Sequence, residues 1–81
     1  MSNYHKQVTI KTIENAKNLV KISAQYNEDI DLTRGRYVID AKSLIGIFTL
    51  DLLQPSVIVI HTDDVNIANK FFEELENAGV K

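Results

Sequence analysis

Four stretches of the chain have the residue pattern of β-strands. Apolar and polar residues alternate over residues 4–11 and again over residues 30–33. An Arg34-Gly35 turn then leads into a β-branched and aromatic run at 36–39, and the fourth stretch, 56–62, is centred on Val57-Ile58-Val59-Ile60. The Gly-containing turn between the second and third stretches predicts a hairpin.

Two longer segments predict amphipathic helices, because their apolar residues recur at spacings of three and four. They cover residues 13–24 and 65–78. Side-chain acceptors before a helix and left-handed residues after it mark the expected ends. The predicted ends are Thr12 and Asn27 for the first helix, and Thr62 or Asp63 and Gly79 for the last.

A third, short and very apolar helix is expected to begin at Ser43, whose hydroxyl can accept a hydrogen bond from the first turn. It is expected to end near Leu53, because Gln54 precedes a proline and is therefore pushed out of the α region. Its apolar residues are too many to face one core, so some are expected at the surface.

The element order is therefore βαββαβα, which predicts an α+β protein with an antiparallel sheet covered by helices on one face. A right-handed crossover from the first strand through the first helix leaves few topologies. Eighty-one residues suffice for one domain with one core, so we assign residues 1–81 to a single domain.

Composition excludes several classes of function. Nine basic against eleven acidic residues, with no basic cluster, argue against a nucleic-acid partner. The absence of cysteine excludes disulfides and thiolate metal sites. No secretory signal and no membrane-spanning apolar run are found, so we expect a cytoplasmic protein without membrane insertion.

The central segment resembles a known family. Lys42-Ser43-Leu44-Ile45-Gly46, followed by Ile47-Phe48-Thr49-Leu50, is similar to the regulatory-serine segment of HPr, the phosphocarrier of the bacterial sugar phosphotransferase system. Asp29-Ile30-Asp31-Leu32 matches the strand at the same distance upstream. The resemblance implies an HPr-like open-faced β-sandwich, a sheet ordered 1-4-2-3, three helices on one face and a protein that is neither an enzyme nor a cofactor carrier.

The same resemblance implies a change in the carrier chemistry. Counted back without a gap from Ser43, the family's phosphorylatable histidine falls on Thr12 and its companion arginine falls on Glu14. A hydroxyl without an activating base is a much poorer phosphoryl acceptor than imidazole, and the carboxylate would repel a phosphoryl donor. We therefore expect a divergent member that lacks the carrier histidine.

Ser43 has two interpretations. On composition alone it is a helix cap, a role that contributes about 1 kcal/mol. The resemblance implies a regulatory phosphoserine beside a docking surface, for which we select Leu44, Ile47 and Phe48. In the family this surface contacts enzyme I, sugar-specific permease domains, the serine kinase and a transcriptional regulator; the simpler alternative is that neighbouring segments cover it.

Two histidines and three valines are expected on the open face of the sheet. His5 and His61 come close together if their strands are antiparallel neighbours, yet two histidines without a placed carboxylate rarely bind a metal, so we assign no metal site. Val38, Val57 and Val59 fit strand propensity without any function, and they also suggest a weak dimer as an alternative to a monomer.

The functional prediction is a regulatory or adaptor protein of the phosphotransferase and catabolite-control network. Two alternatives stay open. The chain could carry phosphate through Thr12 or a histidine, or it could be an interaction module whose Ser43 is never modified.

Overall fold

The computed structural model describes residues 3–49 and 54–81. The elements are β1 (Asn3–Val8), α1 (Ile13–Ser23), β2 (Ile30–Arg34), β3 (Tyr37–Asp40), α2 (Leu44–Ile47), β4 (Ser56–His61) and α3 (Val65–Asn77). The predicted order βαββαβα is confirmed.

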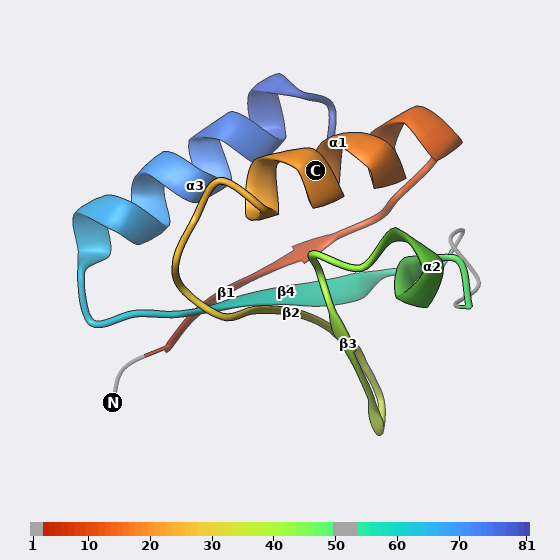
Figure 1. The fold of residues 1–81 in the computed structure, drawn as a ribbon, viewed down its shortest axis with the longest axis horizontal. Helices are drawn as coiled ribbons and strands as arrows, with labels where there is room; N and C mark the ends of the chain where they lie inside the picture. The colour runs from red at the N-terminus through yellow and green to blue at the C-terminus, as the bar shows by residue number, and fades with distance from the viewer. Residues whose placement is uncertain (1–2, 50–53) are drawn as a thin grey trace.

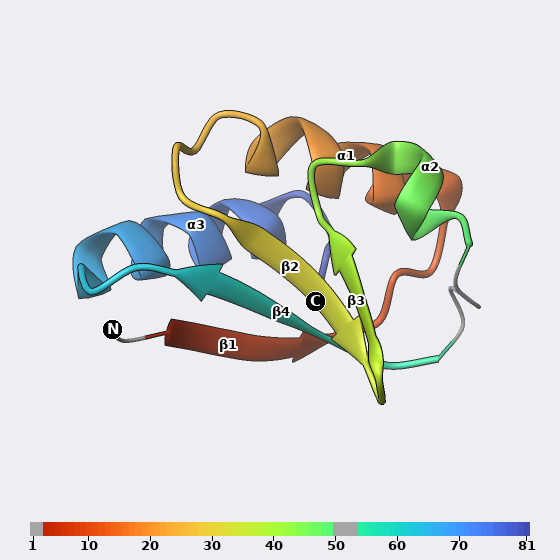
Figure 2. The same ribbon diagram turned by 60° about the horizontal axis from the view of Figure 1, so that its bottom comes forward.

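The strands form one sheet in the order β1-β4-β2-β3, and every neighbouring pair is antiparallel. Figures 1 and 2 show the three helices on one side of this sheet, with the other side open. The predicted α+β fold and strand order are therefore confirmed. The hairpin of β2 and β3 projects away from the helices (Figure 1).

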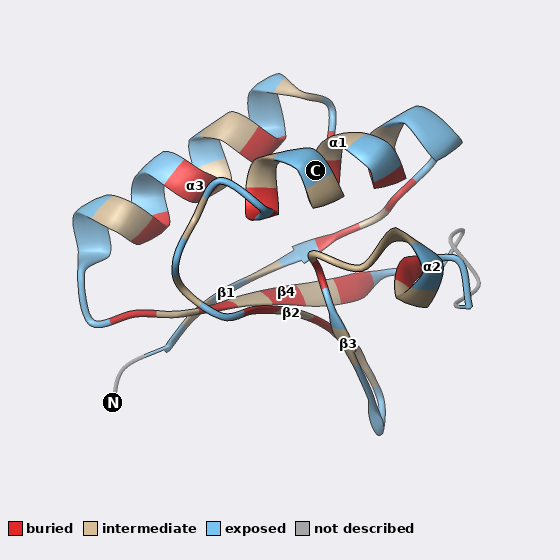
Figure 3. Cartoon of the chain, viewed as in Figure 1, coloured by how far each residue is buried: buried red, intermediate tan, exposed pale blue. Residues whose placement is uncertain are grey.

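The core lies between the helices and the inner face of the sheet. Strand register places Ile30 beside Ile60 and Leu32 beside Ile58, and all four are buried. Burial alternates along β4 because successive side chains point to opposite faces (Figure 3). The helices contribute buried residues from their apolar stripes, namely Ala16 and Leu19 of α1 and Ala68, Phe71 and Leu75 of α3.

The ends of the first helix are only partly as predicted. Thr12 is the N-cap, as expected. The prediction for Asn27 is wrong: α1 ends at Ser23 with Ala24 as C-cap, and none of the described non-glycine residues has a positive φ. Tyr26 N–H donates to the Ser23 carbonyl at 3.1 Å, so a tight last turn satisfies the helix end without a left-handed residue.

The cap of the last helix also differs from the prediction. Asp64, not Thr62 or Asp63, is the N-cap of α3, and its Oδ1 accepts from Asn66 N–H at 2.9 Å. Thr62 is buried, and its Oγ1 accepts from Asp64 N–H at 3.1 Å, so Thr62 fixes the turn that precedes α3. Gly79 follows the helix with φ +85°, the left-handed conformation predicted for it.

Of two other predicted element ends, one is corrected by the structure and one lies outside the described residues. β1 ends at Val8 rather than at Lys11, because the chain there leaves the sheet and Thr9 N–H donates to the Lys81 carbonyl at 3.4 Å. α2 is described over Leu44–Ile47, with Phe48 as C-cap. Its predicted extension to Leu53 lies outside the described residues.

Tyr26 connects three parts of the fold. Its ring packs edge-on against Phe71 of α3 at a centroid distance of 5.2 Å, and its hydroxyl donates to Glu74 Oε1. Its backbone carbonyl accepts from Lys42 Nζ at 2.8 Å. The loop after α1 is therefore tied both to α3 and to the residue that precedes Ser43.

The ionisation of Tyr26 gives a pH prediction. Burial, followed by the hydrogen bond to Glu74 and the charge of Glu74, raises the pKa of the Tyr26 hydroxyl. The folded state therefore holds this proton more tightly than the unfolded state, so the stabilisation is complete below the unfolded pKa of about 10 and is lost as pH rises through the folded value. Urea unfolding from pH 8 to 11.5 should show stability falling above pH 10.

In the same titration Tyr26→Phe should be less stable at pH 8 by about 1 kcal/mol, since a hydrogen bond is removed, and its stability should fall less steeply above pH 10. Tyr37→Phe, at an exposed tyrosine, is the matched control and should keep the wild-type pH dependence. Equal slopes for wild type and Tyr26→Phe would contradict the assignment.

Candidate functional site

The N-terminus of α1 is built on an exposed threonine. Thr12 has extended backbone angles (φ −140°, ψ 161°), and its Oγ1 accepts from Asn15 N–H at 3.0 Å. Glu14 lies in the first turn, where an acidic side chain is favoured by the helix dipole, and it is exposed. The first turn is therefore capped by a hydroxyl and already carries a negative charge.

The N-terminus of α2 is built in the same way on Ser43. Its backbone is extended (φ −109°, ψ 103°), and its Oγ accepts from Gly46 N–H at 3.2 Å. Ser43 is half-buried, and Asp40 Oδ1 fixes the preceding turn by accepting from Lys42 N–H at 2.9 Å. The predicted capping role of Ser43 is confirmed, and phosphorylation there stays a prediction.

Gly46 lets α2 lie against β3. A Cβ atom at this position would stand 2.8 Å from Ile39 Cγ2 and 3.3 Å from Ser43 Oγ. Both distances are shorter than ordinary van der Waals contacts, and Ile39 has a stiff β-branched side chain that cannot easily withdraw. Close approach of the helix to the sheet therefore requires glycine here.

The predicted docking residues separate onto two faces of α2. Ile47 is fully buried in the core, so its selection as a surface contact is wrong. Leu44, three residues earlier, is half-buried and packs against the same core. Phe48 is 44% exposed, as a docking residue requires, although its role stays a prediction.

Two apolar residues that sequence reasoning did not select are more exposed. Ile45 on α2 is 82% exposed, and Ile13 at the start of α1 is 61% exposed. α2 contacts α1 and lies beside the end at which α1 begins (Figures 1 and 2). Helical phase could have found Ile45, which lies three residues before Phe48. We call Ile13, Ile45 and Phe48 the helix-end surface.

The two histidines lie on the open face, as expected. Asn3 is opposite His61 and His5 is opposite Val59, so the histidines are diagonal neighbours. His61 Nδ1 lies 3.0 Å from Asn3 Oδ1, and Nε2 lies 2.7 Å from Asp31 Oδ2. Both ring nitrogens therefore have partners on the neighbouring strands.

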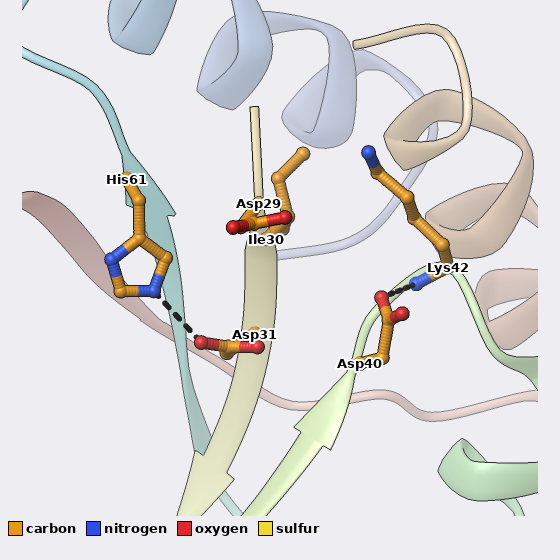
Figure 4. Close-up of a pocket in the computed structure, with 6 residues that line it drawn as sticks. All are labelled: Asp29, Ile30, Asp31, Asp40, Lys42 and His61. Carbon is orange, nitrogen blue, oxygen red and sulfur yellow. Dashed lines mark hydrogen bonds and ion pairs between the residues drawn. The ribbon is translucent and has the colours of Figure 1, made fainter. Parts of the chain in front are cut away.

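His61 lines an open pocket of about 280 Å³ (Figure 4). The other lining residues are Asp29, Ile30, Asp31, Asp40 and Lys42. Within residues 3–49 and 54–81, no group of three or more histidine or acidic side chains is arranged to hold a metal ion. The contacts of His61 are those of a structural side chain that links β1, β4 and β2.

An antiparallel sheet in the order β1-β4-β2-β3 with three helices on one face is the open-faced β-sandwich expected for the HPr family. A family model described as "PTS HPr component phosphorylation site" matches residues 4–78. The chain belongs to the HPr family of the sugar phosphotransferase system.

Solved structures of HPr proteins have the same fold at low sequence identity. The phosphocarrier protein HPr from Bacillus anthracis str. Ames is 19% identical over 100% of both chains, with a TM-score of 0.73. HPr-C-His from Thermoanaerobacter tengcongensis is 19% identical over 96% of this chain and 94% of its own, with a TM-score of 0.70. A Mycoplasma histidine-containing phosphocarrier protein is 15% identical over 95% of this chain and 90% of its own, with a TM-score of 0.65.

No curated protein matches the chain. In the part of the chain that the structure describes, no helix is long and apolar enough to cross a membrane. Proteins of the HPr family are phosphocarriers and not catalysts.

The contact between α2 and β3 gives a stability prediction. Gly46→Ala should gain about 1 kcal/mol of helix propensity yet destabilise the protein by about 1–3 kcal/mol overall, since the new methyl group meets Ile39. Urea unfolding measures the net change. In an Ile39→Ala background the same substitution should lose its penalty, and an unchanged penalty there would show that the contact is not its cause.

Proposed function

We propose that this HPr-family chain is a regulatory adaptor of the phosphotransferase and catabolite-control network and does not relay phosphate. The observation that carries the proposal is the pair Thr12 and Glu14 at the start of α1. In the ungapped alignment with the HPr family that starts from Ser43, these residues stand in place of the carrier histidine and its companion arginine. The expected compartment is the cytoplasm.

The chemistry of that helix end argues against phosphoryl transfer. A helix N-terminus favours an incoming anion through its dipole and free N–H groups. Here, however, Thr12 Oγ1 already accepts the Asn15 N–H, and the Glu14 carboxylate lies in the same turn. A dianionic phosphoryl group would meet a like charge and a hydroxyl that lacks an activating base.

Neither histidine offers a good replacement. Both nitrogens of His61 are engaged, and Asp31 and Asp40 in the same pocket would repel a phosphoryl donor. His5 is exposed on the edge strand β1, on the face of the sheet opposite the helices, so no helix N-terminus on that face stabilises a phosphoryl group. These contacts favour the adaptor over an alternative carrier.

The helix-end surface supports the binding role. Exposed apolar side chains that project from two adjacent helix ends mark a partner surface more often than a structural one. Ile45 and Phe48 come two and five residues after Ser43, and the half-buried Leu44 lies between Ser43 and Ile45 in the sequence. Partners are expected among phosphotransferase-system proteins and a transcriptional regulator of catabolite control.

Ser43 is the proposed switch of this surface. Phosphorylation would add a charge of about −2 at the start of α2, where backbone N–H groups can bind the phosphoryl oxygens, so no refolding is needed. The new charge would lie beside Ile45 and Phe48 and would oppose burial of apolar surface there. An interaction module whose Ser43 is never modified would use the same surface without this switch.

Incubation with enzyme I and labelled phosphoenolpyruvate tests the loss of carrier chemistry. The chain should remain unlabelled, whereas Thr12→His combined with Glu14→Arg should accept an acid-labile phosphate. Glu14→Arg alone is the matched control and should stay unlabelled, because it removes the repulsion without supplying an imidazole. Stable label on the unaltered chain would overturn the proposal.

A further inference from the structure

β3 is an exposed edge strand. It is the last strand in the order β1-β4-β2-β3, so the described part of the chain pairs it on one side only. Tyr37 and Val38 are 62% and 65% exposed, and the hairpin that contains them extends away from the helices (Figures 1 and 2). An edge strand of this kind presents unpaired backbone groups to a second strand.

The contacts around β3 identify which backbone groups face outward. Ala41 N–H donates to the Ile30 carbonyl at 2.9 Å, so residue 41 bonds toward β2. The Asp40 carbonyl instead accepts from Ser43 N–H at 3.0 Å, on the side away from β2. Because bonding direction alternates along an antiparallel strand, the N–H and C=O of Val38 also point outward, as does the N–H of Asp40.

The charges on this segment form a complementary pattern. Arg36 precedes the strand, Asp40 ends it, and the three residues between are uncharged. Antiparallel pairing of two such segments about Val38 would bring each Arg36 opposite Asp40 of the other segment.

The electrostatic surroundings of the Asp40 carboxylate favour a cationic partner. It lies opposite Asp31 in the register of β2 and β3, in a non-hydrogen-bonded position where side chains approach most closely. His61 pairs with Asp31 at 2.7 Å, whereas Asp40 accepts from the Lys42 backbone N–H (Figure 4). Among the residues that the structure describes, Arg36 makes no hydrogen bond or ion pair with its side chain.

We propose that two copies of this chain pair antiparallel through β3, in a register centred on Val38. Each Val38 N–H donates to the Val38 carbonyl of the second copy, and each Asp40 N–H faces an Arg36 carbonyl. Tyr37 lies opposite Ile39 of the second copy on the inner face. On the outer face Arg36 lies opposite Asp40 of the second copy, and the two-fold axis repeats this pair.

The other edge of the sheet does not fit this role. β1 carries a single lysine, Lys6, which lies 3.5 Å from Glu76, and it contains no acidic residue. Self-pairing of β1 therefore forms no opposite-charge pair. Because β3 has only four residues, the interface is small and the dimer is expected to form reversibly with concentration.

Charge exchange tests the register. Sedimentation velocity should show the wild type shifting from monomer toward dimer as its concentration approaches about 1 mM. Arg36→Asp and Asp40→Arg should each weaken dimerisation at least about tenfold, because each places like charges opposite one another. An equal mixture of the two variants should regain a dimer, since every facing pair is then opposite in charge.

A wild type that stays monomeric at about 1 mM would overturn the proposal. So would single variants that dimerise like the wild type, or folded variants whose mixture regains nothing. Circular dichroism establishes that each variant is folded. This control is needed above all for Asp40→Arg, because the Asp40 carboxylate also fixes the turn before Ser43.

Cysteine cross-linking gives an independent test, because the chain has no cysteine of its own. Residues of a hydrogen-bonded antiparallel pair have Cα atoms about 5.5 Å apart, within the range of disulfides. Val38→Cys should therefore form a covalent dimer under mild oxidation. His5→Cys, exposed on the β1 edge, is the matched control and should cross-link far more slowly; equal rates would contradict pairing through β3.

Discussion

The structure depends on the burial of one face of a four-stranded sheet. Ile30, Leu32, Ile58 and Ile60 are inward and buried, and only helices packed on that side can cover them. The start of α1 and the short α2 consequently lie side by side at one end of the molecule (Figure 1). The open face and the β3 edge remain for other contacts.

Much of this architecture could be predicted from the sequence because its causes are local. Two-residue alternation identified β1 and β2, runs of β-branched and aromatic residues identified β3 and β4, and hydroxyl side chains at Thr12 and Ser43 marked the start of two helices. Prediction failed where packing decides between equivalent residues. Ile47 and Ile45 are equally apolar, yet the orientation of α2 on the sheet buries one and exposes the other.

The contacts that distinguish this chain could not be predicted, since they join residues far apart in sequence. Lys42 binds the Tyr26 carbonyl, and Asp31 lies between His61 and Asp40 only in the observed register. A slip of one residue would move these side chains to the other face of the sheet. The same register leaves the Asp40 carboxylate beside a like charge.

Ser43 caps α2, and under the proposed function its phosphorylation switches the binding surface. Calorimetric titration of enzyme I should be done before and after treatment of the chain with the HPr serine kinase. The proposed switch predicts one added phosphate and at least about tenfold weaker binding, with neither change in Ser43→Asn, which keeps a capping side chain but no hydroxyl. No added phosphate, or equal affinity of the phosphorylated and unmodified chains, would contradict it.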